Sequence, residues 1–355
     1  MSPCGLVLFF AGLIVLLLAA PSVTGQTSRA DSAKSYLERG SGWLKKGEIE
    51  RAISDFDLAI ATDQRLAAAW YNRGVARYRQ GDRDGALRDY NQAFQLTPRH
   101  VETLLNRGAI FFEQGDFTAA LHDFEAIIEI NPRHARAYVN RGLVRERTGD
   151  PAGAMADFTQ AIKLDRRLHE AWTGRCGALV RQGQLAAARA DCEQALKLAP
   201  DNAEALATRG ALRQAQGDFD GALADYSRAL SRAPHMAAIW NNRGRAWLLK
   251  DDYERALADL NRALELDPQL PGVWDNRARV WFSQGEFTRA LEDFDQALQL
   301  NPRFVAALAG RGVTHLRLGQ MAEAERDFAR CREISGGLPP YATAAWREAQ
   351  ERPRK

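Results

Sequence analysis

The sequence predicts an all-α fold built from nine tandem helical hairpins. Two observations predict it. A unit of 34 residues recurs nine times without insertion or deletion from Ala33 to Leu338, and the apolar positions of each unit recur at helical spacing. A period of this length is typical of solenoids, in which each unit buries its apolar face on its neighbours. Positions within a unit are numbered from 1 to 34, so that Trp70 occupies position 4 of the second unit, Ala67–His100.

Each unit is expected to form helix A over about positions 1–14 and helix B over about positions 17–31. Glycine at position 15 in eight units suits the turn between the helices, and proline at position 32 in six units ends helix B. Position 20 is alanine in all nine units and position 8 is glycine in seven. Such small residues let two helices approach closely, while bulky residues at positions 4 and 24 fill the space between them.

A pair of opposite charges recurs in every unit. Position 7 is arginine and position 23 is aspartate in all nine units, from Arg39 and Asp55 to Arg311 and Asp327. In an antiparallel hairpin that turns near position 15, these two positions lie at the same height. We therefore predict a structural Arg–Asp ladder, formed within a unit or between helix B and the next helix A. A functional array of charges is the alternative.

The period, the alternation of small and large residues, the Gly-Asp turn and the terminal proline resemble the tetratricopeptide repeat family over Ala33–Leu338. The resemblance implies a right-handed superhelical solenoid whose A helices line a concave groove that binds extended peptides. Arginine at position 7 departs from the apolar residue usual in the family. Residues 339–355 are expected to form a C-terminal cap helix that ends in a basic tail.

The resemblance also implies which residues meet a ligand. Position 6 is asparagine in five units, and some family members grip a peptide backbone with such rows, because an amide both donates and accepts hydrogen bonds. The alternative is that these amides are ordinary helix surface facing water. The predicted peptide-binding residues are Asn72, Asn106, Asn140, Asn242 and Asn276, with Tyr71, Tyr78, Phe112 and Arg79 at neighbouring groove positions.

The fifth unit has cysteines at two positions where most other units have glycine and an aromatic residue. Cys176 at position 8 and Cys192 at position 24 lie nearly opposite each other across the hairpin. We predict an intra-repeat disulfide, which fits export to an oxidising compartment. The alternative is two small buried thiols that compensate each other's volume. Cys331 occupies the small position 27 and is expected to be a buried, inert thiol.

The N-terminus lies outside the array. Gly5–Ala20 is uncharged and almost wholly apolar, and small residues follow it up to Gly25. Residues 1–25 are predicted to be a cleaved signal peptide, followed by a short lead over residues 26–32. A retained membrane anchor over residues 5–23 and a wrong start codon are the alternatives, and no Lys or Arg precedes the apolar run. Cleaved or retained, the segment places the array outside the cytoplasm, as a periplasmic, secreted or anchored protein.

Composition and motifs exclude several functions. The net charge of +3 and the lack of basic runs interleaved with aromatic residues argue against nucleic-acid binding. The sequence has no HExxH, GxSxG or Walker motif, so we expect no enzyme, no cofactor and no metal. The predicted function is a non-enzymatic scaffold that binds protein or peptide partners in the groove, within an envelope assembly. A regulatory subunit or sensor for a small ligand or glycan, and a self-associating structural array, are the alternatives.

Overall fold

The computed structural model describes residues 29–351 of the chain. This part of the chain forms 19 α-helices and contains no β-strand. The predicted signal peptide or anchor, residues 1–25, lies outside the described residues, as do residues 26–28 and the last four residues of the basic tail. Among the helices of residues 29–351, none combines the length and the apolar character needed to cross a membrane.

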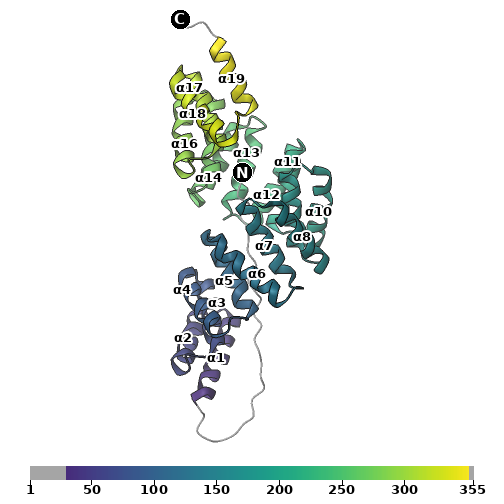
Figure 1. The fold of residues 1–355 in the computed structure, drawn as a ribbon, viewed down its shortest axis with the longest axis vertical. Coiled ribbons are helices and arrows are strands. Elements are labelled where there is room, and N and C mark those ends of the chain that lie inside the picture. Colours follow the sequence, from purple (N-terminus) through teal and green to yellow (C-terminus); the bar gives the residue numbers. More distant parts are fainter. Residues whose placement is uncertain (1–28, 352–355) are drawn as a thin grey trace. The chain divides into compact units, whose positions relative to one another are not determined.

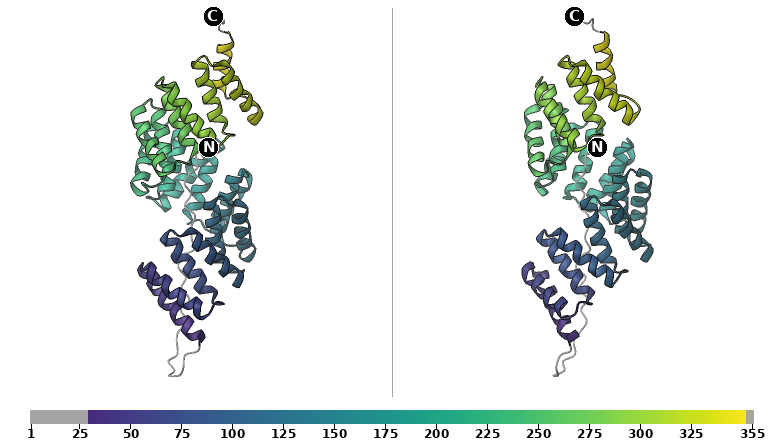
Figure 2. Two further views of the ribbon diagram at one scale, coloured as in Figure 1. Left: turned by 90° about the vertical axis from the view of Figure 1, so that its left-hand side faces the viewer. Right: turned by 60° about the vertical axis from the view of Figure 1, so that its left-hand side comes forward.

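The helices follow one another as hairpins (Figures 1 and 2). The odd-numbered helices α1–α17 are the A helices, the even-numbered helices α2–α18 are the B helices, and α19 follows the last hairpin. Their bounds are α1 Arg29–Lys46, α2 Ile49–Thr62, α3 Ala67–Gln80, α4 Arg83–Leu96, α5 Val101–Gln114, α6 Phe117–Ile130, α7 Ala135–Thr148, α8 Pro151–Leu164, α9 His169–Arg181, α10 Leu185–Leu198, α11 Ala203–Ala215, α12 Phe219–Arg232, α13 Ala237–Leu248, α14 Tyr253–Leu266, α15 Pro271–Ser283, α16 Phe287–Leu300, α17 Val305–Arg317, α18 Met321–Ser335 and α19 Pro340–Glu351. The predicted all-α fold of tandem helical hairpins is confirmed.

The described residues divide into two compact units, an N-terminal unit of residues 29–178 and a C-terminal unit of residues 179–351. Within each unit, an A helix packs on the B helix of its own hairpin, and that B helix packs on the next A helix. Consecutive A helices also contact each other, as α5 and α7 do in the N-terminal unit and α13 and α15 in the C-terminal unit. Consecutive B helices of the described chain do not pack together in this way. The A helices therefore line the more tightly packed side of each unit.

The Gly-Asp turn between helices A and B works as predicted. Gly81 has a φ of +92°, a conformation that glycine adopts without steric cost, and Asp82 caps α4 by accepting a hydrogen bond from the Gly85 amide at 2.8 Å. The seventh hairpin has Asp251 in place of this glycine, and it keeps the positive φ, at 57°. Aspartate is one of the few other residues that tolerate this region. The turn geometry is thus retained in the hairpin that lacks the glycine.

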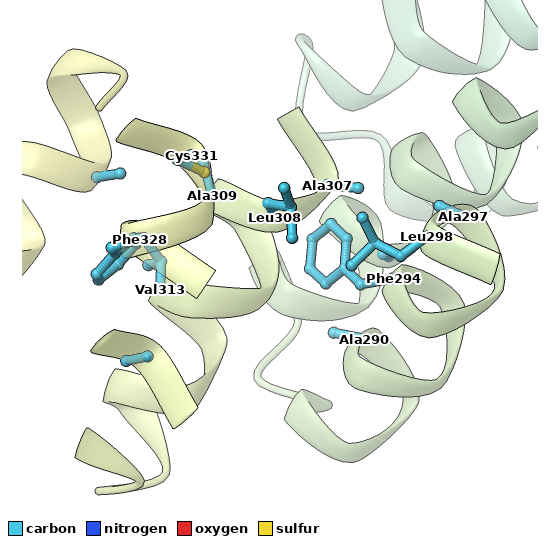
Figure 3. Close-up of a cluster of buried hydrophobic side chains, with 13 residues drawn as sticks. Ala290, Phe294, Ala297, Leu298, Ala307, Leu308, Ala309, Val313, Phe328 and Cys331 are labelled. Carbon is cyan, nitrogen blue, oxygen red and sulfur yellow. The ribbon is translucent and has the colours of Figure 1, made fainter. Parts of the chain in front are cut away.

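The small residues at position 8 face the large residues at position 24. A Cβ added to Gly74 would lie 2.7 Å from the Tyr90 ring, which is too close for any real side chain. Figure 3 shows that a ring at position 24 also packs on the next hairpin, where Phe294 and Leu298 of α16 lie beside Leu308 of α17. These rings are fully buried. Their burial contributes a large apolar area to the packing of a hairpin on its neighbours.

The arginine at position 7 links two repeats. Arg107 donates from Nε and Nη2 to Asp123 of its own hairpin at 2.8 and 2.6 Å, and from Nη1 to Asn91 of the preceding helix B at 3.2 Å. The predicted ladder is confirmed, and it serves both the hairpin and its junction with the preceding repeat. The same two-bond pairing holds Arg39–Asp55, Arg73–Asp89, Arg141–Asp157, Arg209–Asp225, Arg243–Asp259, Arg277–Asp293 and Arg311–Asp327.

Candidate ligand-binding surface on the A helices

Side-chain hydrogen bonds run from one A helix to the next. Tyr78 on α3 donates to Glu113 on α5 at 2.7 Å, and in the C-terminal unit Asn276 on α15 donates to Asn241 on α13 at 2.8 Å. Because consecutive A helices meet only on this side, the side chains that make these bonds mark one continuous face in each unit. We call it the A-helix surface.

Four of the five predicted asparagines are buried rather than displayed on that surface. Asn106 and Asn140 are each 1% exposed, Asn242 and Asn276 are also buried, and only Asn72 is partly accessible. The Asn106 amide donates weakly to the hydroxyls of Tyr71 and Tyr90 at 3.4 Å. The amides of Asn106 and Asn276 therefore connect neighbouring hairpins in the packed structure. Peptide binding by the row remains a prediction.

The burial of position 6 has a simple packing reason. Its side chain faces the ring at position 24 of the preceding hairpin, as Asn106 faces Tyr90. At Gly174, an added Cβ would lie 2.6 Å from the Phe158 ring, and at Gly310 it would lie 2.5 Å from the Phe294 ring. The glycines that interrupt the asparagine row were thus a sequence signal that position 6 belongs to the interface between repeats.

Asn140 differs from Asn106 in its surroundings. Both polar atoms of its side-chain amide are buried, and neither has a hydrogen-bond partner in the described protein. Leu105 and Phe124 occupy the same repeat positions relative to Asn140 that Tyr71 and Tyr90 occupy relative to Asn106. Neither of these apolar side chains offers a hydrogen bond, and an unsatisfied buried amide costs stability. The Asn140 amide therefore lowers the stability of the N-terminal unit.

The other predicted groove residues of the N-terminal unit differ in accessibility. Tyr71 and Phe112 are buried, and burial raises the pKa of Tyr71 well above its usual value. Tyr78 is half-buried, and burial together with its bond to Glu113 raises its pKa in the same direction. Arg79 is exposed and donates to the Leu44 carbonyl at 3.3 Å. Arg79 is therefore the predicted residue that this unit exposes, while Tyr78 and Asn72 are partly accessible.

In the C-terminal unit, two arginines occupy position 9 of consecutive A helices in different environments. Arg279 on α15 pairs with Asp275 one turn earlier, its Nε lying 2.9 Å from the carboxylate, and it donates to the Ala306 carbonyl at 3.2 Å. The ring of Tyr341 on α19 lies 5.8 Å from its guanidinium carbon. Arg245 on α13 is exposed. It has Asn241, not a carboxylate, one turn earlier.

Helix α19 covers the end of the A-helix surface. It packs on α17, with Ala342 fully buried and Trp346 edge-on to Phe328 at 5.4 Å between ring centroids. Together with the contact of Tyr341 on Arg279, this packing occupies the last A helices of the C-terminal unit. The part of the surface that α19 leaves uncovered runs over α11 and α13.

Three sequence-family models described as "Tetratricopeptide repeat" match the chain. One covers residues 37–101, 71–131, 105–169 and 207–271, and the others cover residues 170–202 and 243–309. The chain belongs to the tetratricopeptide repeat family. No curated protein matches its sequence significantly.

Solved structures share the tetratricopeptide fold with this chain. The crystal structure of the APC/C hetero-tetramer Cut9–Hcn1 is similar with a TM-score of 0.65 and 14% identity, over 90% of this chain and 76% of that one. The structure of pilF from Pseudomonas aeruginosa is similar with a TM-score of 0.50 and 22% identity, over 59% of this chain and 96% of that one. At these identities the likeness concerns the fold alone.

Other findings concern helix caps and cysteines of this tetratricopeptide array. His100 and His134 at position 34 are helix caps, which sequence reasoning missed: their Nδ1 atoms accept from the amides of Thr103 and Ala137 at 3.3 and 3.2 Å. Cys331 is buried and free, as expected. Cys176 and Cys192 are also buried, and the disulfide between them remains a prediction.

Proposed function

We propose that this tetratricopeptide protein is a non-enzymatic scaffold that binds extended peptides or protein partners in a concave groove lined by its A helices. Repeats of this family support protein interaction in general. One observation carries the proposal. The A-helix surface keeps hydrogen-bonding and apolar side chains accessible, namely Tyr78 and Arg79 in the N-terminal unit and Arg245 and Leu249 in the C-terminal unit.

The chemistry of these side chains suits a peptide. A peptide in extended conformation presents donors and acceptors along its backbone and apolar side chains between them. Arginine supplies several donors in a fixed geometry, and tyrosine supplies a large apolar ring with one polar atom. In many interfaces these two residue types contribute most to affinity.

We also place the scaffold outside the cytoplasm, in an envelope assembly. The apolar run Gly5–Ala20 followed by small residues supports export, either by cleavage after Gly25 or as a retained anchor over residues 5–23. Fractionation of cells that express the full chain, with N-terminal sequencing of the recovered protein, tests this part. An N-terminus at Gln26 is expected for cleavage, and recovery from the cytoplasm would contradict export.

Site-specific cross-linking tests the binding proposal. A photo-reactive amino acid is placed at Arg79 on α3, and in a second protein at Arg88 on α4 of the same hairpin, which is equally exposed but lies on a B helix. Both proteins are irradiated in native extract. We expect a defined set of protein adducts from the Arg79 position and few from the Arg88 position. Equal adducts from both positions, or none from either, would contradict the proposal.

A further inference from the structure

Arg245 is a charged side chain without a counter-charge. It forms no ion pair with any residue of the described chain, although it is exposed on the A-helix surface. Arg279, at the same position one repeat later, is neutralised by Asp275. The equivalent of Asp275 beside Arg245 is Asn241, whose side-chain oxygen already accepts from Asn276. The comparison within the same unit shows that the solenoid neutralises one arginine at this position and leaves the other available.

A buried amide holds this arginine in place. In the orientation that satisfies both ends of the side chain, Gln214 on α11 accepts from Arg245 Nε and Nη2 at 2.8 and 2.9 Å, and donates to the Tyr226 hydroxyl at 3.2 Å. Gln214 is only 6% exposed, so its own position is fixed by packing. Because arginine has five N–H donors, three remain for a ligand. The guanidinium is thus oriented before any ligand binds, which lowers the entropy cost of binding.

An apolar side chain lies next to this cation. Leu249 is the C-cap residue of α13, four residues after Arg245, and is 50% exposed, which is unusual for a leucine in this structure. Residues four apart on a helix share a face. A ligand on Arg245 therefore also meets Leu249.

We propose that Arg245 anchors a carboxylate subsite that takes an acidic side chain of an extended peptide, with an apolar neighbour of that side chain packed on Leu249. The inference rests on the proposed function and specifies its ligand class. A carboxylate matches the planar, forked donors of arginine better than any other common peptide group. The A-helix surface continues from α13 over α11, whereas on the other side Tyr341 of α19 covers Arg279 of α15. The peptides below therefore separate an acidic side chain from a chain terminus as the source of the carboxylate.

The subsite is tested with the full chain and three labelled peptides, by fluorescence anisotropy. The first is Gly-Ser-Leu-Glu-Leu-Ser-Gly with an amidated C-terminus. The second has Gln in place of Glu, and the third is the Gln peptide with a free C-terminal carboxylate. We expect the Glu peptide to bind about tenfold more tightly than the amidated Gln peptide, as one charge-assisted pair provides.

Matched variants assign that preference to its residues. Arg245→Gln should reduce the preference for Glu to less than about twofold. Arg317→Gln removes another exposed arginine, on α17, and should leave the preference unchanged. Gln214→Leu removes the group that positions Arg245, and with it a hydrogen bond to the Tyr226 hydroxyl. It should weaken the Glu peptide several-fold while the Gln peptide is unaffected.

Several results would overturn the inference. These are equal binding of the Glu and Gln peptides, a preference that survives Arg245→Gln, and no binding of any peptide at millimolar concentration. Tighter binding of the free-carboxylate Gln peptide than of the Glu peptide would show that the subsite binds a C-terminal carboxylate. This result would overturn the proposal that it binds an acidic side chain. Cross-linking at Arg79 tests the scaffold function in the other unit, so the subsite can fail while the proposed function stands.

Discussion

The Arg–Asp ladder leads to a prediction about stability, and another hairpin of the same chain supplies the control variant. In the third hairpin, the Arg107 side chain is 8% exposed and that of Asp123 is 1% exposed. Arg107→Met keeps the apolar stem of the side chain but removes the charge. It leaves the Asp123 carboxylate buried without its two donors. We expect this variant to destabilise the N-terminal unit.

The expected magnitude follows from burial. Removing one partner of a buried ion pair costs about 3–5 kcal/mol, because the remaining charge is uncompensated. The double variant Arg107→Met/Asp123→Leu removes both charges and should recover most of that loss. Arg39→Met at the first hairpin is the matched control, because the Arg39 side chain is 56% exposed. Water can replace its hydrogen bonds, and the loss of stability should be clearly smaller than for Arg107→Met.

Urea unfolding monitored by hydrogen exchange measures these differences, with the amides of α5 and α6 for the Arg107 variants and those of α1 and α2 for the Arg39 control. Exchange is needed because a repeat array does not always unfold in a single step. The reasoning is refuted if Arg107→Met costs no more than Arg39→Met. It is also refuted if the double variant is as unstable as the single one, because the loss would then come from packing and not from the stranded charge.

Three further predictions concern other features of the array. Burial lowers the pKa of His134 below its usual value of 6.5. The stability of the fold should therefore be greatest above pH 6.5 and fall as the pH drops through the lowered pKa. In melting curves between pH 5 and 8, His134→Asn should keep the helix cap and reduce this pH dependence. Gly74→Ala should cost about 1–3 kcal/mol in chemical unfolding, because the new methyl group meets the Tyr90 ring. Peptide maps without reductant should show Cys176 linked to Cys192, with a stabilisation of about 3 kcal/mol over the reduced protein, and thiols that can be alkylated at both positions would contradict the disulfide.

The hairpins could be predicted from the sequence because nine copies of the repeat show which residue types each position accepts. Invariant Asp and Arg at fixed positions predicted the ladder, and glycine before Asp82 predicted both the turn and the cap of α4. These features depend on residues within one hairpin. The periodic pattern determines their relative positions without knowledge of the rest of the molecule.

The A-helix surface was harder to predict because it depends on contacts between repeats. Whether Asn106 faces solvent or the ring of Tyr90 is decided by the angle between successive hairpins, which a periodic pattern does not give. The role of Arg245 depends on Gln214 one repeat earlier, and neither residue stands out in the sequence alone. The contact of α19 with the last hairpin involves Trp346, whose ring meets Phe328 of α18.

Affinity capture from native extract tests the central claim, that partners bind the A-helix surface. The full chain is compared with an A-helix variant, Arg79→Glu/Arg245→Glu, and with a B-helix variant, Arg88→Glu/Arg189→Glu, that reverses the same number of exposed charges. All three proteins must have equal helicity and melting temperature. We predict that the same partners are captured by the full chain and the B-helix variant and are lost from the A-helix variant. Partners that remain on the A-helix variant but are lost from the B-helix variant would contradict the account.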